Sequence, residues 1–181
     1  PALQELLGSN GLLDAKLKIP INAPQSVMLS AYHEINDRWA VMGNVGWQAW
    51  SEFGSLDVGV SAEDTNSLTV DMNYDDTWSV AAGLQYKVSD PLLLSLGIAY
   101  NSSMMGDDER TPSVPSGEVW QFGTGLKYKV KKDLDVSGAY ELAWLGDLSM
   151  DVDRRPLAGR VSGEYTDTSM HFINLALNWR F

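Results

Sequence analysis

The sequence predicts an all-β fold, an antiparallel up-and-down transmembrane β-barrel of about eight strands. Three observations predict it: apolar and polar residues alternate along many segments, several segments are long enough to cross a bilayer as tilted strands, and short turns alternate with long loops. The chain has 181 residues, the length of one domain. Its apolar runs are all shorter than the roughly 20 residues that a membrane helix needs, so any membrane crossing must use strands.

The alternation is clearest in the last nine residues. One face carries Ile173, Leu175, Leu177, Trp179 and Phe181, and the other carries Asn174, Ala176, Asn178 and Arg180. Side chains of a strand point alternately to its two sides, so this segment has an apolar and a polar face. Alone, it fits a half-buried strand of a soluble sandwich equally well. A terminal aromatic on such a strand resembles the assembly signal of bacterial outer-membrane barrels, which implies the barrel assembly machinery as a partner.

The same alternation recurs upstream. The expected strands cover residues 13–19, 27–31, 39–50, 78–88, 92–100, 120–130, 134–144 and 173–181. Most apolar faces have an aromatic residue near an end, as lipid-facing strands do at the two membrane interfaces. We expect the residue sets around Leu94, Leu126, Leu142 and Leu175 to face lipid. The opposite faces are rich in Gly, Ala, Ser, Gln and Lys, which suit a wet lumen better than a soluble core.

Two kinds of connection separate these strands. Tight turns are expected at 36–37, 89–91 and 131–133, where residues typical of turns occur. Longer connections are expected at about 62–66, the tip of an extended hairpin, and at 101–117 and 145–159. Short turns at one end and long loops at the other are typical of outer-membrane barrels.

The composition excludes several classes of function. A net charge of −11 argues against nucleic-acid binding, and the absence of cysteine excludes disulfides and thiolate sites. Acidic groups at 63–64, 107–109 and 151–153 are interpreted as solvated loop charge, with divalent-ion bridging at a membrane surface as the alternative. Residues 1–10, an irregular or short helical lead-in, lack the pattern of a secretory signal. Either export is not involved or a signal has been removed.

Catalytic and metal-binding motifs are not visible in the sequence. His33 and His171 lie on separate expected strands without partners at metal-ligand spacing. The Gly123-Thr124-Gly125 segment is followed by a strand pattern instead of a helix, so it is not a phosphate loop. Asp75 and Asp76 are expected to be solvated. We therefore expect no enzyme, no metal and no cofactor.

Five segments, taken in order, are similar to one known family. They are Trp47-Gln48-Ala49-Trp50-Ser51-Glu52-Phe53, residues 74–86, residues 96–103, residues 110–115 and the closing strand to Phe181. From about Leu17 onward the chain resembles the long-chain fatty acid and hydrocarbon transporters of the bacterial outer membrane.

This resemblance implies a barrel of fourteen strands with an N-terminal plug, or hatch, inside it. Residues 1–181 would form one barrel segment, the C-terminal part with the last eight strands, and the hatch would be absent. The implied function is diffusion of long-chain fatty acids or other hydrophobic compounds across the outer membrane. The implied surroundings are outer-membrane lipid and lipopolysaccharide.

Candidate ligand-binding residues are apolar side chains that face inward or lie near the outer loops, and one loop cation: Met42, Trp50, Phe53, Met104, Met105, Arg110 and Phe172. Met42, Trp50 and Phe172 are expected to face inward. The alternative is that these side chains only pack against a hatch or each other. The acids before Trp78 depart from the basic residue expected there in fatty acid transporters, which leaves a neutral hydrocarbon ligand open.

Two other classes of protein remain open. One is a closed eight-stranded outer-membrane barrel that acts as a structural anchor or adhesin, because eight strands leave an interior only wide enough for side chains or one small ligand. The other is a soluble lipocalin-like binder, which should purify without detergent.

Overall fold

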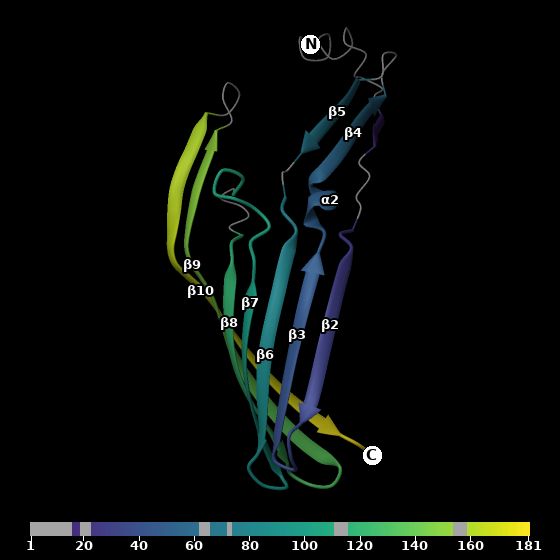
Figure 1. Ribbon diagram of the computed structural model, residues 1–181, viewed down its shortest axis with the longest axis vertical. Helices are drawn as coiled ribbons and strands as arrows, with labels where there is room; N and C mark the ends of the chain where they lie inside the picture. The colour runs from purple at the N-terminus through teal and green to yellow at the C-terminus, as the bar shows by residue number, and fades with distance from the viewer. Residues whose placement is uncertain (1–15, 19–22, 62–65, 72–73, 111–115, 154–158) are drawn as a thin grey trace.

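The computed structural model describes residues 16–18, 23–61, 66–71, 74–110, 116–153 and 159–181 (Figure 1). These residues are almost entirely antiparallel β-structure, which confirms the predicted fold class. The only helix among them is the short α2 (Trp50–Gly54), and none in this part is long and apolar enough to cross a membrane. The strands are β1 (Lys16–Lys18), β2 (Ser26–Glu34), β3 (Trp39–Gln48), β4 (Ser55–Ser61), β5 (Asn66–Asp71), β6 (Thr77–Lys87), β7 (Leu92–Asn101), β8 (Val119–Lys129), β9 (Leu134–Asp153) and β10 (Arg160–Trp179).

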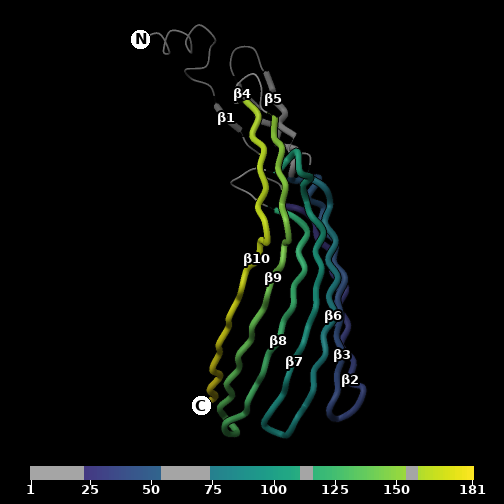
Figure 2. Tube along the Cα trace, turned by 90° about the vertical axis from the view of Figure 1, so that its left-hand side faces the viewer, coloured from purple at the N-terminus to yellow at the C-terminus, as the bar shows by residue number. Residues whose placement is uncertain are grey.

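Seven strands form one curved sheet, the wall, in the order β10-β9-β8-β7-β6-β3-β2 (Figure 2). Every neighbouring pair is antiparallel. The three expected tight turns join β2 to β3, β6 to β7 and β8 to β9 at one end, the turn end. In the first of them Asn36 Oδ1 accepts hydrogen bonds from the backbone N–H of Arg38 (2.9 Å) and Trp39 (3.0 Å). This turn chemistry places the start of β3.

A second, three-stranded sheet has the order β1-β4-β5. The hairpin of β4 and β5 is inserted between β3 and β6 and continues beyond their outer ends (Figure 1). Its tip at 62–65 lies outside the described residues. The expected strand at 13–19 is described only at Lys16–Lys18, which pairs with β4 and not with the wall. The wall therefore has seven of the eight expected strands.

The register divides the wall into two faces, because directly paired residues point to the same side of a sheet. Leu94 pairs with Leu126, and Leu142 pairs with Phe122, so the predicted lipid-facing sets share one face. Their side chains are uncovered: Leu126 is 48% exposed and Leu175 is 82% exposed. An apolar surface that continues across seven strands is unfavourable in water and suits the hydrocarbon of a bilayer.

Aromatic residues border this apolar face at both ends. Tyr100, Trp120 and Trp144 are paired across three strands at the outer end, and the rings of Tyr100 and Trp120 lie 5.0 Å apart. At the turn end the ring of Trp39 lies 4.3 Å from that of Tyr86. Two aromatic borders are typical of strands that place amphipathic rings at both membrane interfaces.

The two edges of the wall are β2 and β10. Because neighbours are antiparallel and the strand number is odd, both edge strands run toward the turn end (Figure 1). Joining the edges directly would make a parallel pair, whereas barrels of this kind pair their strands antiparallel. Antiparallel closure needs an odd number of further strands. The described wall is thus not the closed eight-stranded barrel considered as an alternative.

Residues 145–153 are part of a strand and not of the long loop that the sequence predicts at 145–159, of which 154–158 lie outside the described residues. β9 continues to Asp153 and β10 starts at Arg160, so the two strands project as a hairpin beyond their neighbours (Figures 1 and 2). The extended part of β9 does alternate, with Leu148, Met150 and Val152 set between polar residues, and the prediction of a loop overlooked this pattern. Gly146 and Asp167 have positive φ values of 67° and 53° where the pairing register shifts near the base of this projection.

The two faces of the wall predict different tolerance to charge. In the protein that carries this chain, at its native length, Leu126→Arg should cost about 2 to 4 kcal/mol of folding free energy because it places a cation in lipid. Gln121→Arg, on the opposite face of the same strand, should cost much less. Folding into lipid vesicles measures both. Equal costs would contradict the assignment of the faces.

Candidate functional site

The inner face of the wall forms a cavity of about 880 Å³, here called the trough. One register row crosses all seven strands at its centre: Tyr32, Met42, Gly83, Gly97, Gly123, Glu141 and Phe172. All seven line the trough. The row has large side chains on its outer strands and glycine on its three middle strands.

The three central glycines make the backbone itself the floor of the trough. A Cβ atom on Gly123 would meet nothing within 4 Å, so the space above it is open. A Cβ atom on Gly83 would lie 2.8 Å from Cγ of Met42, so the Met42 side chain lies over Gly83. The open part is therefore bounded by Met42 on one side and by Glu141 and Phe172 on the other.

A chain of polar side chains crosses β7, β8 and β9 beside the glycines. Asn101 Nδ2 donates to Gln121 Oε1 at 2.9 Å, and Gln121 Nε2 donates to Glu141 Oε1 at 2.8 Å. Gln121 uses its amide oxygen toward one neighbour and its amide nitrogen toward the other, so its orientation is set. The chain fixes the Glu141 carboxylate at the wall of the trough.

Cations gather on the inner face toward the turn end. Asp135 is 7% exposed and has one carboxylate oxygen 3.3 Å from both Lys127 Nζ and Arg180 Nη2. Lys87 forms a 2.8 Å ion pair with Asp90 of the adjacent turn. The inner face thus has a negative charge at the trough and positive charges toward the turn end.

Of the three side chains expected to face inward, two lie on the inner face. Met42 and Phe172 occupy the central row on β3 and β10. Trp50 does not continue the strand as expected, because β3 ends at Gln48 and Trp50 begins α2. Its indole Nε1 donates to Gln48 Oε1 at 3.2 Å, so the ring folds back toward the strand end. The alternation before Trp50 does not reveal this helical turn.

α2 is tied to the start of β6. Asp76 Oδ1 accepts hydrogen bonds from Ser51 Oγ (2.6 Å) and from the Ser51 backbone N–H (3.2 Å), and these bonds lower the pKa of Asp76 below its usual value. Phe53 lies between aromatic neighbours, with ring centroids 5.5 Å from Trp50 and 6.5 Å from Tyr74. These contacts place Trp50 and Phe53 at the outer end of the wall and outside the lining of the trough.

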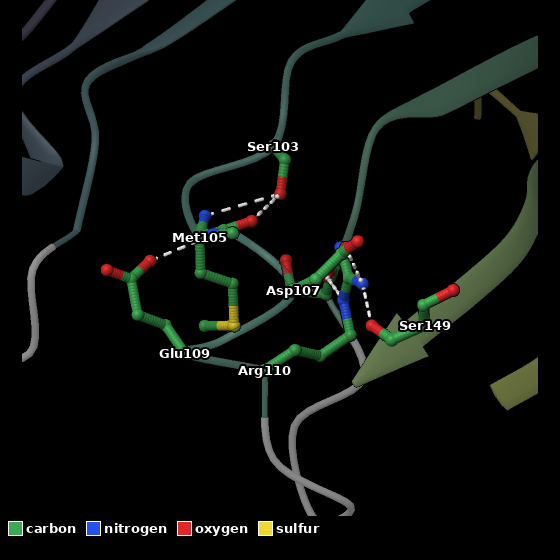
Figure 3. Close-up of polar contacts among 8 residues, drawn as sticks. Ser103, Met105, Asp107, Glu109, Arg110 and Ser149 are labelled. Atoms are coloured by element: carbon green, nitrogen blue, oxygen red, sulfur yellow. Dashed lines mark hydrogen bonds and ion pairs between the residues drawn. The ribbon is translucent and has the colours of Figure 1, made fainter. Parts of the chain in front are cut away.

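The connection between β7 and β8 contains the other three candidates (Figure 3). Arg110 is buried, and its guanidinium donates to Asp107 Oδ1 (2.6 Å), to the Ser116 carbonyl (2.6 Å) and to the Ser149 carbonyl of β9. The backbone of Asp107 also accepts from the Asp151 N–H at 2.9 Å. Arg110 thus joins the connection to the projecting hairpin.

Met104 and Met105 differ in their surroundings. Met105 is only 4% exposed, and Ser103 Oγ donates to its carbonyl at 2.7 Å. Met104 is half-buried, and its carbonyl accepts from the Asp75 N–H at 2.8 Å. Both methionines therefore belong to a packed outer connection and not to the trough.

The predicted acidic groups make more contacts than solvated loops require. Asp107 pairs with Arg110, Glu109 accepts from the Gly106 N–H at 2.9 Å, and Asp151 lies on β9, where Arg160 Nε donates to it at 2.6 Å. The group at 63–64 lies outside the described residues. In the described part of the chain no group of three or more His, Asp or Glu side chains could hold a metal ion.

The two histidines lie apart on the outer face. His33 on β2 pairs across the sheet with Val41. His171 Nδ1 lies 2.7 Å from the Tyr140 hydroxyl, whose ring neighbours it on β9. Both positions fit the structural role favoured by the sequence.

The alternation puts Glu141 and Gly123 on the polar faces of their strands, where Gly123-Thr124-Gly125 is expected to leave room inside the barrel, but Glu141 is not among the predicted site residues. Alternation along one strand assigns a residue to a face, whereas only the register between strands shows that the glycines are aligned and that Glu141 ends the open space. The signal that could have found Glu141 is its charge on a face otherwise made of small residues.

A family model described as "Outer membrane protein transport protein (OMPP1/FadL/TodX)" matches residues 2–181. The chain is 29% identical over 152 residues to a candidate outer membrane protein of Neisseria meningitidis, covering 80% of this chain and 33% of that protein. It is 26% identical over 151 residues to a long-chain fatty acid transport protein of Escherichia coli, covering 77% and 33%. The chain spans about a third of the length of these relatives, which fits a part of a larger barrel.

Solved structures agree with this fold. A FadL homologue of Pseudomonas aeruginosa superposes with a TM-score of 0.74 at 25% identity, covering 86% of this chain and 35% of that one. The toluene transporter TodX of Pseudomonas putida shares the fold with a TM-score of 0.56 at 19% identity, covering 92% and 37%. The chain therefore belongs to the OMPP1/FadL/TodX family of outer membrane transport proteins, and its location is the bacterial outer membrane.

Proposed function

We propose that the protein that carries this chain takes up long-chain fatty acids or other hydrophobic compounds by diffusion, with the trough as part of the ligand path. The observation that carries the proposal is the row of three aligned glycines, which leaves open space between Met42 and Phe172. A volume of about 880 Å³ lies within the usual range of ligand cavities. The side chains around the glycines are small, so they give the ligand path an apolar surface and leave it wide.

Family membership supports transport over an anchor or adhesin. Relatives include long-chain fatty acid transport proteins and a toluene transporter. The open wall also supports transport, because it leaves room for a lumen wider than eight strands enclose. Passage by diffusion needs no catalytic group and no cofactor.

The apolar candidate residues divide among three proposed roles. Met42 and Phe172 contact ligand in the trough, whereas Trp50 and Phe53 line the approach from the outside. Met104 and Met105 shape the outer connection. The alternative for Met42 and Phe172 is contact with a hatch inside the barrel, and a blocking substitution in the open space separates transport from packing.

Gly123→Phe should lower uptake of a hydrophobic ligand at least tenfold, because the ring would project into the open part of the trough. Leu126→Phe is the matched control, since Leu126 is exposed on the opposite face of the same strand and does not line the trough. Uptake by cells and the amount of assembled protein are measured together. Unchanged uptake in Gly123→Phe would contradict a path through the trough.

We propose that Arg110 supports the outer connection and does not bind a ligand carboxylate, because its donors already face Asp107, Ser116 and Ser149. Arg110→Gln should cost about 1 to 3 kcal/mol because it removes the charged donor that binds Asp107 and two backbone carbonyls. It should therefore increase protease cleavage of the connection and reduce uptake of acids and neutral compounds alike. Loss of acid uptake alone would show that Arg110 is a ligand cation.

We propose that Phe181 is read by the barrel assembly machinery. Its side chain is fully exposed, while Trp179 and Arg180 are tied to the β8–β9 turn through Asp133. Phe181→Ala should therefore reduce the assembled amount in cells and leave the unfolding midpoint of the purified protein within about 1 °C. Normal surface levels would count against this role.

A further inference from the structure

Glu141 is the charged residue at the centre of the trough. Among the described residues that line the cavity, the others are small, polar without full charge, or apolar, as Ala99, Asn44 and Phe172 are. A carboxylate in such surroundings interacts electrostatically with any ligand that passes the glycines. It is paired across the sheet with Gly123, directly beside the open space.

The position of this carboxylate is fixed by its neighbours. Gln121 donates to Oε1 and is itself oriented by Asn101, and all three residues belong to adjacent strands of one ladder. Only Oε1 is engaged by this chain of hydrogen bonds. Because the strands hold Asn101 and Gln121 in place, this hydrogen bond favours the observed position of the carboxylate.

No cation in the described part of the chain neutralises Glu141. The nearer of the two inner-face cations on the neighbouring strand is Lys127, four residues beyond Gly123 and hence about 13 Å along the strand. Lys127 is also paired with Asp135. The outer cation Arg110 is buried against Asp107. The trough therefore has a negative charge beside its open centre.

We propose that Glu141 determines ligand specificity by disfavouring carboxylates, so that this transporter prefers neutral hydrophobic compounds over fatty acids. This inference rests on the proposed uptake function and names its ligand class. In a space bordered by apolar groups, an unpaired anion is repelled by a fixed carboxylate more strongly than in bulk water. A hydrocarbon is not repelled, and a hydroxyl group can donate a hydrogen bond to the carboxylate.

The test compares dodecanoate with 1-dodecanol, which have chains of equal length and differ in charge. Uptake is measured in proteoliposomes that contain the native-length protein. The wild type should favour the alcohol. Glu141→Gln keeps the size and an acceptor for Gln121, and it should raise dodecanoate uptake roughly tenfold while dodecanol uptake stays within about twofold.

Two further variants make the result specific. Glu164→Gln removes one negative charge from the exposed projecting hairpin and should change neither uptake rate. Gln121→Lys places a cation beside Glu141 and should also raise dodecanoate uptake, which covers the case in which Glu141→Gln does not assemble. The unfolding midpoint and assembled amount are measured for each variant.

The inference is overturned if dodecanoate uptake is unchanged in both trough variants, or if both ligands rise or fall together. A common fall would mean that Glu141 holds another part of the protein. Wild-type protein that passes neither ligand would contradict the proposed function itself, and the inference would fall with it. Uptake of dodecanol together with a preference for dodecanoate would contradict the inference alone.

Discussion

The structure depends on one constraint: backbone N–H and C=O groups inside a bilayer must pair with each other, because lipid offers no partner. In the wall this pairing is supplied by six antiparallel ladders between seven strands. The ladders leave unpaired groups only at β2 and β10, and the odd strand number gives these edges the same direction. Seven further strands would complete an antiparallel barrel of fourteen, the number that the family resemblance implies.

Because the backbone groups are paired within the sheet, the side chains of its two faces can differ in composition. The outer face must be apolar between its aromatic borders, so its residue types are narrowly limited. The inner face meets no lipid and can hold glycine, amides or charge. The ligand path proposed above therefore lies on the inner face, where Gly123 leaves open space and Glu141 supplies charge without weakening the contact with lipid.

The sequence predicts the spanning strands well because the lipid face imposes alternation on them. The strands expected at 78–88, 92–100 and 120–130 are found within one residue of their described ends. The prediction is poorer where lipid no longer acts: β9 and β10 extend into an expected loop, and Trp50 enters a helix. Candidate residues on the outer connection, such as Arg110, have contacts that arise only when distant strands meet.

The charges of the inner wall have an order along the proposed ligand path. The outer connections are acidic, the trough has the fixed carboxylate of Glu141, and the lysines at 87, 127 and 129 lie toward the turn end. A ligand that enters from outside as an anion meets repulsion before it reaches any attraction. Because Coulomb energies fall with distance and are screened by water, the distant lysines compensate little for this repulsion at the trough. A neutral molecule is neither repelled by the carboxylates nor attracted by the lysines. The burial of its apolar surface therefore decides its passage.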